Sequence, residues 1–79
     1  MFTRQQIDSI AIGQTKISAS IDGVHFGEPT RVVEIFAIGV SVRGHRYVCG
    51  YREYGEGARI SFSISEADAT DARLYRIHN

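Results

Sequence analysis

The spacing of hydrophobic residues changes along the chain from a helical period to an alternating one. Near the start, the hydrophobic residues that share one helical face are Ile7, Ile10 and Ala11. Thr3 and Gln6 have the three-residue spacing of a capping box, in which each side chain bonds to the backbone of the other residue. The pattern predicts a short N-terminal helix from about Arg4 to Ile12.

From Lys16 onward, hydrophobic and polar residues alternate, which is typical of a strand with one face in water. The pair Asp22-Gly23 follows this strand and favours a two-residue hairpin with a type I′ turn. Pairing Ile21 with Val24 places the hydrophobic residues of both arms on one face. The segment is therefore predicted to form a β-hairpin.

Further strands are predicted over residues 31–42, 46–54 and 58–64. The first is hydrophobic on both alternating faces, so it must be covered on both sides or bend, and Gly39 is the expected position of the bend. The last strand alternates most regularly, and its inward-facing residues are Ile60, Phe62 and Ile64. The three strands together predict an antiparallel arrangement.

The segment after Ser65 has two interpretations, and the choice between them decides the fold class. One is a helix from Ser65 to about Ile77, with its acidic residues before its basic ones, as the helix dipole favours. The other is a single turn over 66–71 followed by a closing strand, Arg73–Ile77. In the second version, the order of elements over residues 16–77 resembles that of SH3-like barrels.

The predicted fold class is mainly β, in a small α+β protein. It is an SH3-like barrel or a strongly bent antiparallel sheet of about five strands, with a short N-terminal helix. The alternative is an antiparallel sheet with a packed C-terminal helix. A single domain is expected over 1–79, with the helix in 1–13 and the β-rich core in 16–77.

Length and cysteine content limit how this fold can be stabilised. The chain has 79 residues, a size at which stability is small and a disulfide, a metal or a second subunit often contributes. Cys49 is the only cysteine, so no disulfide can form within the chain. Association with a second copy is then the expected source of extra stability, and a homodimer is predicted.

Charge and hydropathy narrow the range of partners. Nine basic and nine acidic residues cancel, so no overall field attracts nucleic acid or an acidic membrane. The sequence does not start with a basic segment followed by a hydrophobic one, and the hydrophobic run Val32–Val42 is about half as long as a membrane span. A cytoplasmic protein without membrane contact is expected.

The spacing of reactive residues gives little support to a catalytic, metal or nucleotide site. The three histidines stand far apart, so no pair has the spacing that holds a metal ion. The glycines within residues 50–57 lack the Lys-Ser/Thr ending of a phosphate loop. Cys49 could act as a nucleophile beside His45, but alternation favours a buried position between Tyr47 and Tyr51 on the core face. We expect that the protein is not an enzyme and that it binds no cofactor and no metal ion.

Arginine and tyrosine residues around the central strands form the candidate binding surface. The candidates are Arg43, Arg46, Arg52, Arg59, Tyr51 and Tyr54. Both residue types are enriched where proteins bind one another. The main hypothesis is a small non-catalytic binding or adaptor module that acts on a protein partner or on its own copy, of the kind that phages and mobile elements use as inhibitors. The alternative is a small barrel that binds single-stranded nucleic acid, with arginines on phosphates and tyrosines stacked on bases.

Overall fold

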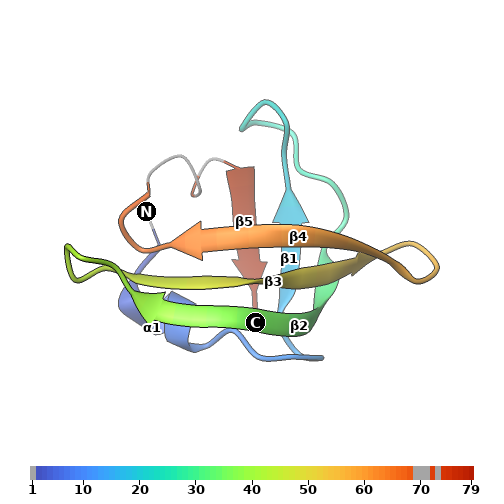
Figure 1. The fold of residues 1–79 in the computed structure, drawn as a ribbon. Coiled ribbons are helices and arrows are strands. Elements are labelled where there is room, and N and C mark those ends of the chain that lie inside the picture. Colours follow the sequence, from blue (N-terminus) through green and yellow to red (C-terminus); the bar gives the residue numbers. More distant parts are fainter. Residues whose placement is uncertain (1, 69–71, 73) are drawn as a thin grey trace.

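The structure, a computed structural model, describes residues 2–68, 72 and 74–79. The helix and strands, in chain order, are α1 (Arg4–Asp8), β1 (Lys16–Ala19), β2 (Thr30–Val40), β3 (Arg46–Tyr54), β4 (Ala58–Ser65) and β5 (Tyr75–His78). The strands form one antiparallel sheet in the order β4-β3-β2-β1-β5 (Figure 1). No helix in the described part of the chain has the length and apolar character that crossing a membrane requires.

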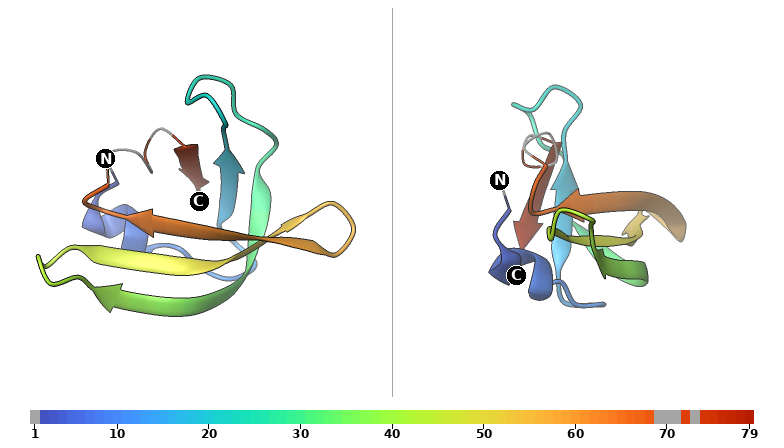
Figure 2. Two further views of the ribbon diagram at one scale, coloured as in Figure 1. Left: turned by 45° about the horizontal axis from the view of Figure 1, so that its top comes forward. Right: turned by 60° about the vertical axis from the view of Figure 1, so that its left-hand side comes forward.

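The predicted fold class is confirmed in its second form, a bent antiparallel sheet of five strands with a short N-terminal helix, as far as the described residues show. The sheet is not closed into a barrel, because β4 and β5 stand at opposite ends of the strand order. β1 and β5 run across the direction of β2, β3 and β4 and lie behind them in the view of Figure 1; Figure 2 shows the same arrangement from two other sides. The alternative with a C-terminal helix to about Ile77 is wrong, since Tyr75–His78 pairs with β1. The predicted turn over 66–71 and Arg73 lie partly outside the described residues.

The bend of the sheet is made by β2. Its first two residues pair with β1, through Ile17↔Thr30 and Lys16↔Arg31, while the strand from Val32 onward pairs with β3. Register shifts follow between Val32 and Glu34 and between Ile35 and Ala37. Such bulges increase the local twist and turn a strand from one layer to the other. The bend therefore comes earlier than Gly39, where it was predicted.

The hydrophobic core lies between the two halves of the bent sheet and is closed by α1. The buried hydrophobic residues are Phe2, Ile7, Ile10, Ile17, Val32, Val48, Phe62 and Ile64. Phe62 and Ile64 are inward-facing, as predicted from the alternation, and Ile60 at the start of β4 remains 39% exposed. The core thus draws on residues far apart in sequence, which antiparallel strands and the helix bring together.

The N-terminal helix is shorter than predicted, although its start is as expected. Thr3 and Gln6 form the capping box, with the Gln6 backbone N–H donating to Thr3 Oγ1 over 3.2 Å. The helix ends at Asp8: the Ser9 N–H still donates to the Gln5 carbonyl, but the Ile10 N–H donates to the Ile7 carbonyl, only three residues back. The Ala11 N–H donates to Thr15 Oγ1, which is itself buried and donates to Asn79 Oδ1 over 3.0 Å. The helix region is in this way fastened to the C-terminal end of the sheet.

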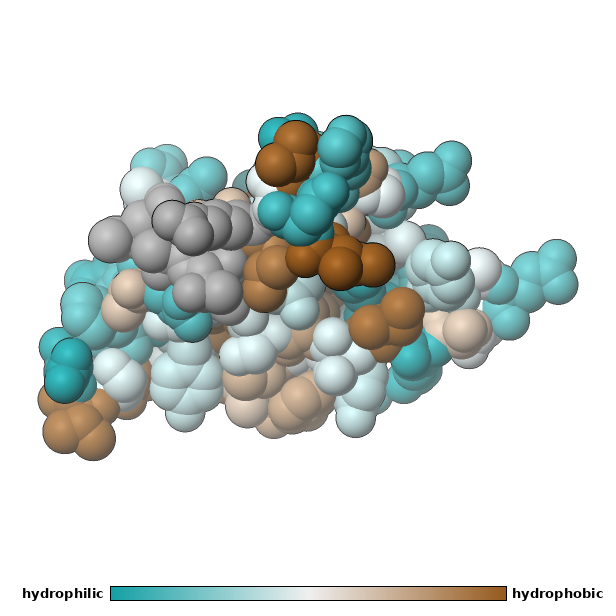
Figure 3. Space-filling model, turned by 90° about the horizontal axis from the view of Figure 1, so that it is seen from above, coloured by the Kyte–Doolittle hydropathy of each residue, from teal (hydrophilic) through white to brown (hydrophobic). Residues whose placement is uncertain are grey.

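The loop after β1 is not the predicted type I′ hairpin. That turn needs a positive φ at both central residues, but only Gly23 has one, at 78°. Asp22 organises the loop instead, because its Oδ1 atom accepts from the backbone N–H groups of Val24 and His25. Ile21 is left fully exposed, and Figure 3, which looks down on the molecule from the side of this loop, shows hydrophobic residues among polar ones.

Titration of Asp22 tests this loop geometry. The ring of His25, the backbone N–H groups of His25 and Val24, and the Ser20 hydroxyl all favour the charged carboxylate, so the pKa of Asp22 is well below its usual value. A lowered folded-state pKa stabilises the loop above the usual carboxyl pKa of about 3.9, and this contribution is lost as the pH falls through the lower value. Carbon-13 NMR of the Asp22 carboxyl should therefore give a midpoint well below about 3.9.

The variant His25→Ala is the matched control for this titration. It removes the side-chain bond that contributes most to the lowered pKa of Asp22 and leaves the backbone bonds in place. Its midpoint should move back toward the usual value. A wild-type midpoint at the usual value would contradict the described loop.

Candidate functional site

The six predicted site residues do not form one surface. Val48 of β3 pairs with Ile64 of β4 and both are buried, which fixes the inner face of β3. By alternation, Arg46, Arg52 and Tyr54 lie on this inner side. Tyr51 and Arg59 lie on the outer side, and Arg43 stands exposed in the turn between β2 and β3. The sheet thus separates the candidate residues into three places.

Two of the four arginines are engaged with carboxylates. Arg46 reaches α1, with 3.0 Å between its Nη1 and Asp8 Oδ1. Arg59 of β4 reaches across the outer face to Glu34 of β2, with 3.2 Å between Nη1 and Oε1. Arg43 is exposed and stands apart from both. Exposed arginines and tyrosines therefore do not line up along one path for a phosphate backbone, which is what the nucleic-acid hypothesis needs.

The outer face of β3 carries Tyr47, Cys49 and Tyr51, the reverse of the orientation expected from alternation alone. Val48 and Gly50 face the core in their place. Tyr51 packs on Phe36 with 5.1 Å between ring centroids. The Cys49 thiol is half-buried and lies 3.5 Å from the Ser63 hydroxyl. The described residues contain no group of three histidine, cysteine or acidic side chains placed to hold a metal ion.

The free edge of β2 is the first feature of the structure that suggests binding. Among the described residues, β3 is the only strand paired with β2 beyond Val32. On this stretch three hydrophobic side chains are more than half exposed, namely Phe36 at 54%, Ile38 at 64% and Val40 at 57%. Val42, in the turn that follows, is fully exposed. We refer to Val33–Val42 as the β2 edge.

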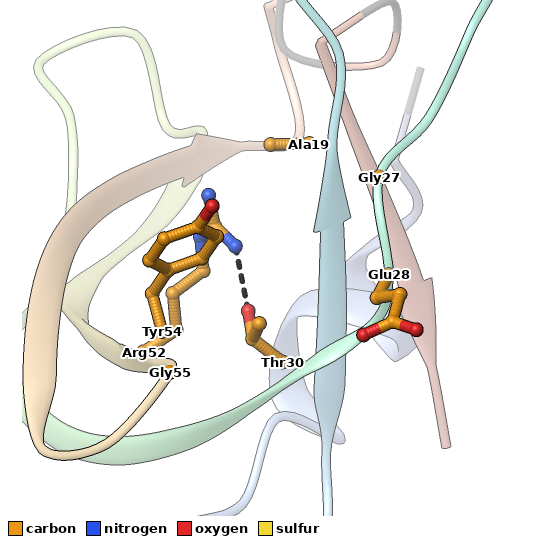
Figure 4. Close-up of a pocket in the computed structure, with 7 residues that line it drawn as sticks. All are labelled: Ala19, Gly27, Glu28, Thr30, Arg52, Tyr54 and Gly55. Carbon is orange, nitrogen blue, oxygen red and sulfur yellow. Dashed lines mark hydrogen bonds between the residues drawn. The ribbon is translucent and has the colours of Figure 1, made fainter.

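The second feature is a cleft that contains Arg52. It has a volume of about 390 Å³ and is lined by Ala19, Gly27, Glu28, Thr30, Arg52, Tyr54 and Gly55 (Figure 4). Arg52 is only 8% exposed, and its Nη1 donates to Thr30 Oγ1 over 2.6 Å. The Thr30 hydroxyl in turn donates to the Ile17 carbonyl over 3.0 Å. The guanidinium is thus held in a fixed position between β1 and β3.

The sequence pointed to Arg52 and Tyr54 but not to the rest of this cleft. Thr30 is the first residue of β2, Glu28 and Gly27 come from the segment that leads into it, and only the bend of the sheet brings these three residues beside β3. One signal was present in the sequence. Arg52 alternates with Val48 and Gly50, and once Val48 is assigned to the core, Arg52 must face inward.

Comparison with protein-family models, with curated proteins and with solved structures gives no match.

Proposed function

We propose that this protein is a small non-catalytic binding module that pairs with a second copy of itself through the β2 edge. The observation that supports the proposal most strongly is the combination, on one stretch of strand, of an unpaired backbone edge and exposed hydrophobic side chains. The single cysteine, Cys49, suits a reducing compartment, so the proposal places the module in the cytoplasm.

The backbone of the β2 edge offers hydrogen bonds to another strand. An edge strand presents a row of N–H and C=O groups that template pairing with a further chain. Natural edge strands prevent such pairing with charges, prolines or short length. The segment from Ile35 to Val42 contains no charged residue and no proline. Glu34 and the two bulges protect the start of the β2 edge, whereas from Ala37 to Val42 the edge carries no charge, no proline and no register shift.

The side chains of the β2 edge would gain from burial. Ile38 and Val40 lie on the same face of the strand, two residues apart, and both are more than half exposed. Fully burying a side chain of this type is worth roughly 1.5–3 kcal/mol. A partner strand laid against the edge brings its own side chains next to these residues, as cross-strand pairs do within a sheet.

A second copy of this chain fits the β2 edge better than a strongly charged partner. Most soluble oligomers are symmetric, and a two-fold axis across the edge pairs the strand with itself in antiparallel orientation. The chain has a net charge of zero, so two copies do not repel each other at long range. A homodimer would also add a continuous sheet across both subunits, which offsets the small core of a short chain.

The variant Ile38→Lys tests the interface. Because each copy contributes the same edge, one substitution places two charges in the dimer, and the dissociation constant should rise at least tenfold, a change of about 1.4 kcal/mol or more. The side chain of Ile38 is 64% exposed in the single chain, so its own fold should be retained. Light scattering over a range of protein concentrations gives the mass of each variant.

The matched control is Ile21→Lys, which adds the same charge to a fully exposed isoleucine on the loop after β1. Its mass profile should follow that of the wild type, which is expected to be a dimer. A wild-type protein that stays monomeric at high concentration would contradict the proposal. So would equal effects of the two substitutions.

A further inference from the structure

Arg52 is a buried cation that has no carboxylate partner among the described residues. The residue is 8% exposed, whereas the arginines in ion pairs, Arg31, Arg46 and Arg59, all have side chains at least 38% exposed. The guanidinium stays charged in proteins, and burying a charge without pairing it costs free energy. Among the described residues, no acidic oxygen lies within ion-pair distance of Arg52. The protein carries this cost in its folded state.

The hydrogen bonds of Arg52 are also incomplete. Nη1 donates to the Thr30 hydroxyl, but the buried Nε has no hydrogen-bond partner in the part of the chain that the structure describes. Leaving a buried donor unsatisfied costs about 1–3 kcal/mol, and more for a charged group. Nearly all buried polar groups in proteins are satisfied, so the enclosed, unpaired Nε adds to the cost of burying a guanidinium whose residue lines an open cleft.

We propose that the cleft around Arg52 binds the carboxylate of a small ligand or of a peptide chain end. A carboxylate has two oxygens at the spacing of two guanidinium N–H groups, and the resulting two-bond pair is the strongest that arginine makes. Such a ligand would supply the opposite charge and an acceptor for the part of the guanidinium that lines the cleft. This inference does not depend on the β2 edge or on dimer formation.

The lining of the cleft fits a planar organic group behind the carboxylate. Tyr54, two residues after Arg52 on the same face of β3, offers a ring and a hydroxyl donor, and it is 60% exposed, so it is free to turn. Ala19, Gly27 and Gly55 leave room where larger side chains would fill the space (Figure 4). A volume of about 390 Å³ lies within the usual range for small-molecule sites.

The charges of the cleft favour one negative charge over two. Of the described residues that line the cleft, Arg52 alone is basic, and Glu28 adds a carboxylate to the lining. The Glu28 side chain points away from the Arg52 guanidinium in Figure 4, so it does not neutralise it. A phosphate dianion would bring two negative charges to a cleft that has one cation and the Glu28 carboxylate. The single negative charge of a monocarboxylate is balanced by Arg52 alone.

The experiment is an NMR titration of the whole chain at constant ionic strength. The probes are N-acetyltyrosine, which carries a carboxylate, its neutral analogue N-acetyltyrosinamide, benzoate and inorganic phosphate. The signals followed are the Arg52 Nε–H group and the backbone amides of Gly27 and Gly55. We expect saturable shifts with N-acetyltyrosine and at least tenfold weaker binding of the amide and of phosphate.

The two sources of a carboxylate are separated by comparing probes. Tighter binding of N-acetyltyrosine than of benzoate assigns the cleft to a peptide chain end, and the reverse assigns it to a small organic acid. Either result supports a carboxylate site. Equal shifts with the acid and its neutral amide would overturn it.

Matched variants complete the test. Arg52→Lys removes the two-bond geometry while keeping the charge, and it should weaken N-acetyltyrosine binding at least tenfold. Arg59→Lys makes the same change at an exposed arginine on the outer face and should leave binding unchanged. Unaltered affinity in Arg52→Lys would contradict the proposal. If that variant fails to fold, the wild-type Nε–H signal decides, because a ligand that leaves it unshifted does not bind the guanidinium.

Discussion

Replacing Gly50 with alanine is expected to lower the free energy of unfolding by about 3 kcal/mol, the upper end of what overpacking costs. A Cβ atom at this position would collide with the Glu34 carbonyl oxygen of β2 and would lie 3.1 Å from the ring of Phe62. Both neighbours are fixed, the first by backbone pairing and the second by the core. Relief requires β2 and β3 to move apart beside the bulges that bend the sheet.

Gly39→Ala is the control for this substitution, since it also adds a methyl group to a glycine in the β2–β3 pair. There the added Cβ would meet the far end of the Tyr47 side chain, 2.5 Å from its hydroxyl oxygen, and that side chain can rotate outward. We expect a loss of about 1 kcal/mol or less. Chemical denaturation measures both variants, and equal losses would contradict the packing described around Gly50.

Truncating Ile64 to alanine is expected to cost about 2–5 kcal/mol, the range for large hydrophobic residues cut back in a core. Ile64 is fully buried and pairs with Val48 in the centre of the sheet. In a domain of this size, each kcal/mol lowers the melting temperature by roughly 4–8 °C. The Ile64→Ala protein should therefore melt at least about 8 °C below the wild type.

Replacing Ile60 with alanine separates the effect of burial on the free energy of unfolding from the effect of strand propensity. Ile60 occupies the same strand and the same alternating face, but it is 39% exposed near the open end of the sheet. Its replacement by alanine should cost about 1 kcal/mol or less. Thermal unfolding of both variants provides the comparison. If Ile60→Ala were as damaging as Ile64→Ala, the inward assignment of β4 would be wrong.

Hydrophobic periodicity was sufficient for β4 and for the start of α1. In β4 the hydrophobic residues occupy one face only, so alternation alone identified Phe62 and Ile64 as inward-facing. Thr3 and Gln6 form their capping box within four residues, and nothing distant alters it. Such local signals are reliable where one face of an element is clearly hydrophobic.

Periodicity failed where both faces of a strand are plausible core faces. In β3, Tyr47 and Tyr51 alternate with Val48 and Arg52, and hydrophobicity alone favoured the tyrosines. The pairing of Val48 with Ile64 decides the orientation, and this is a contact between strands rather than a property of either sequence. The inward position of Arg52 follows from the same pairing, so the cleft could not be predicted from local sequence.

The bend of β2 and the loop at Asp22 show two further limits of prediction from the sequence. The register shifts near Glu34 and Ala37 arise because β2 joins β1 and β3, which run in different directions. At Asp22, side-chain hydrogen bonds replace the tight turn that Asp-Gly favours. Turn propensity does not decide the conformation of this loop, because the Asp22 carboxylate accepts hydrogen bonds from several donors at once.

Amide hydrogen exchange along the β2 edge, measured at a low and a high protein concentration, shows whether two copies pair through this strand. If two copies pair through this edge, the outward-pointing amides between Val33 and Val40 should exchange fast in dilute protein and become protected as the dimer forms. Amides that bond to β3 should stay protected at both concentrations. Exchange of the β2 edge that is independent of concentration would contradict self-association through this strand.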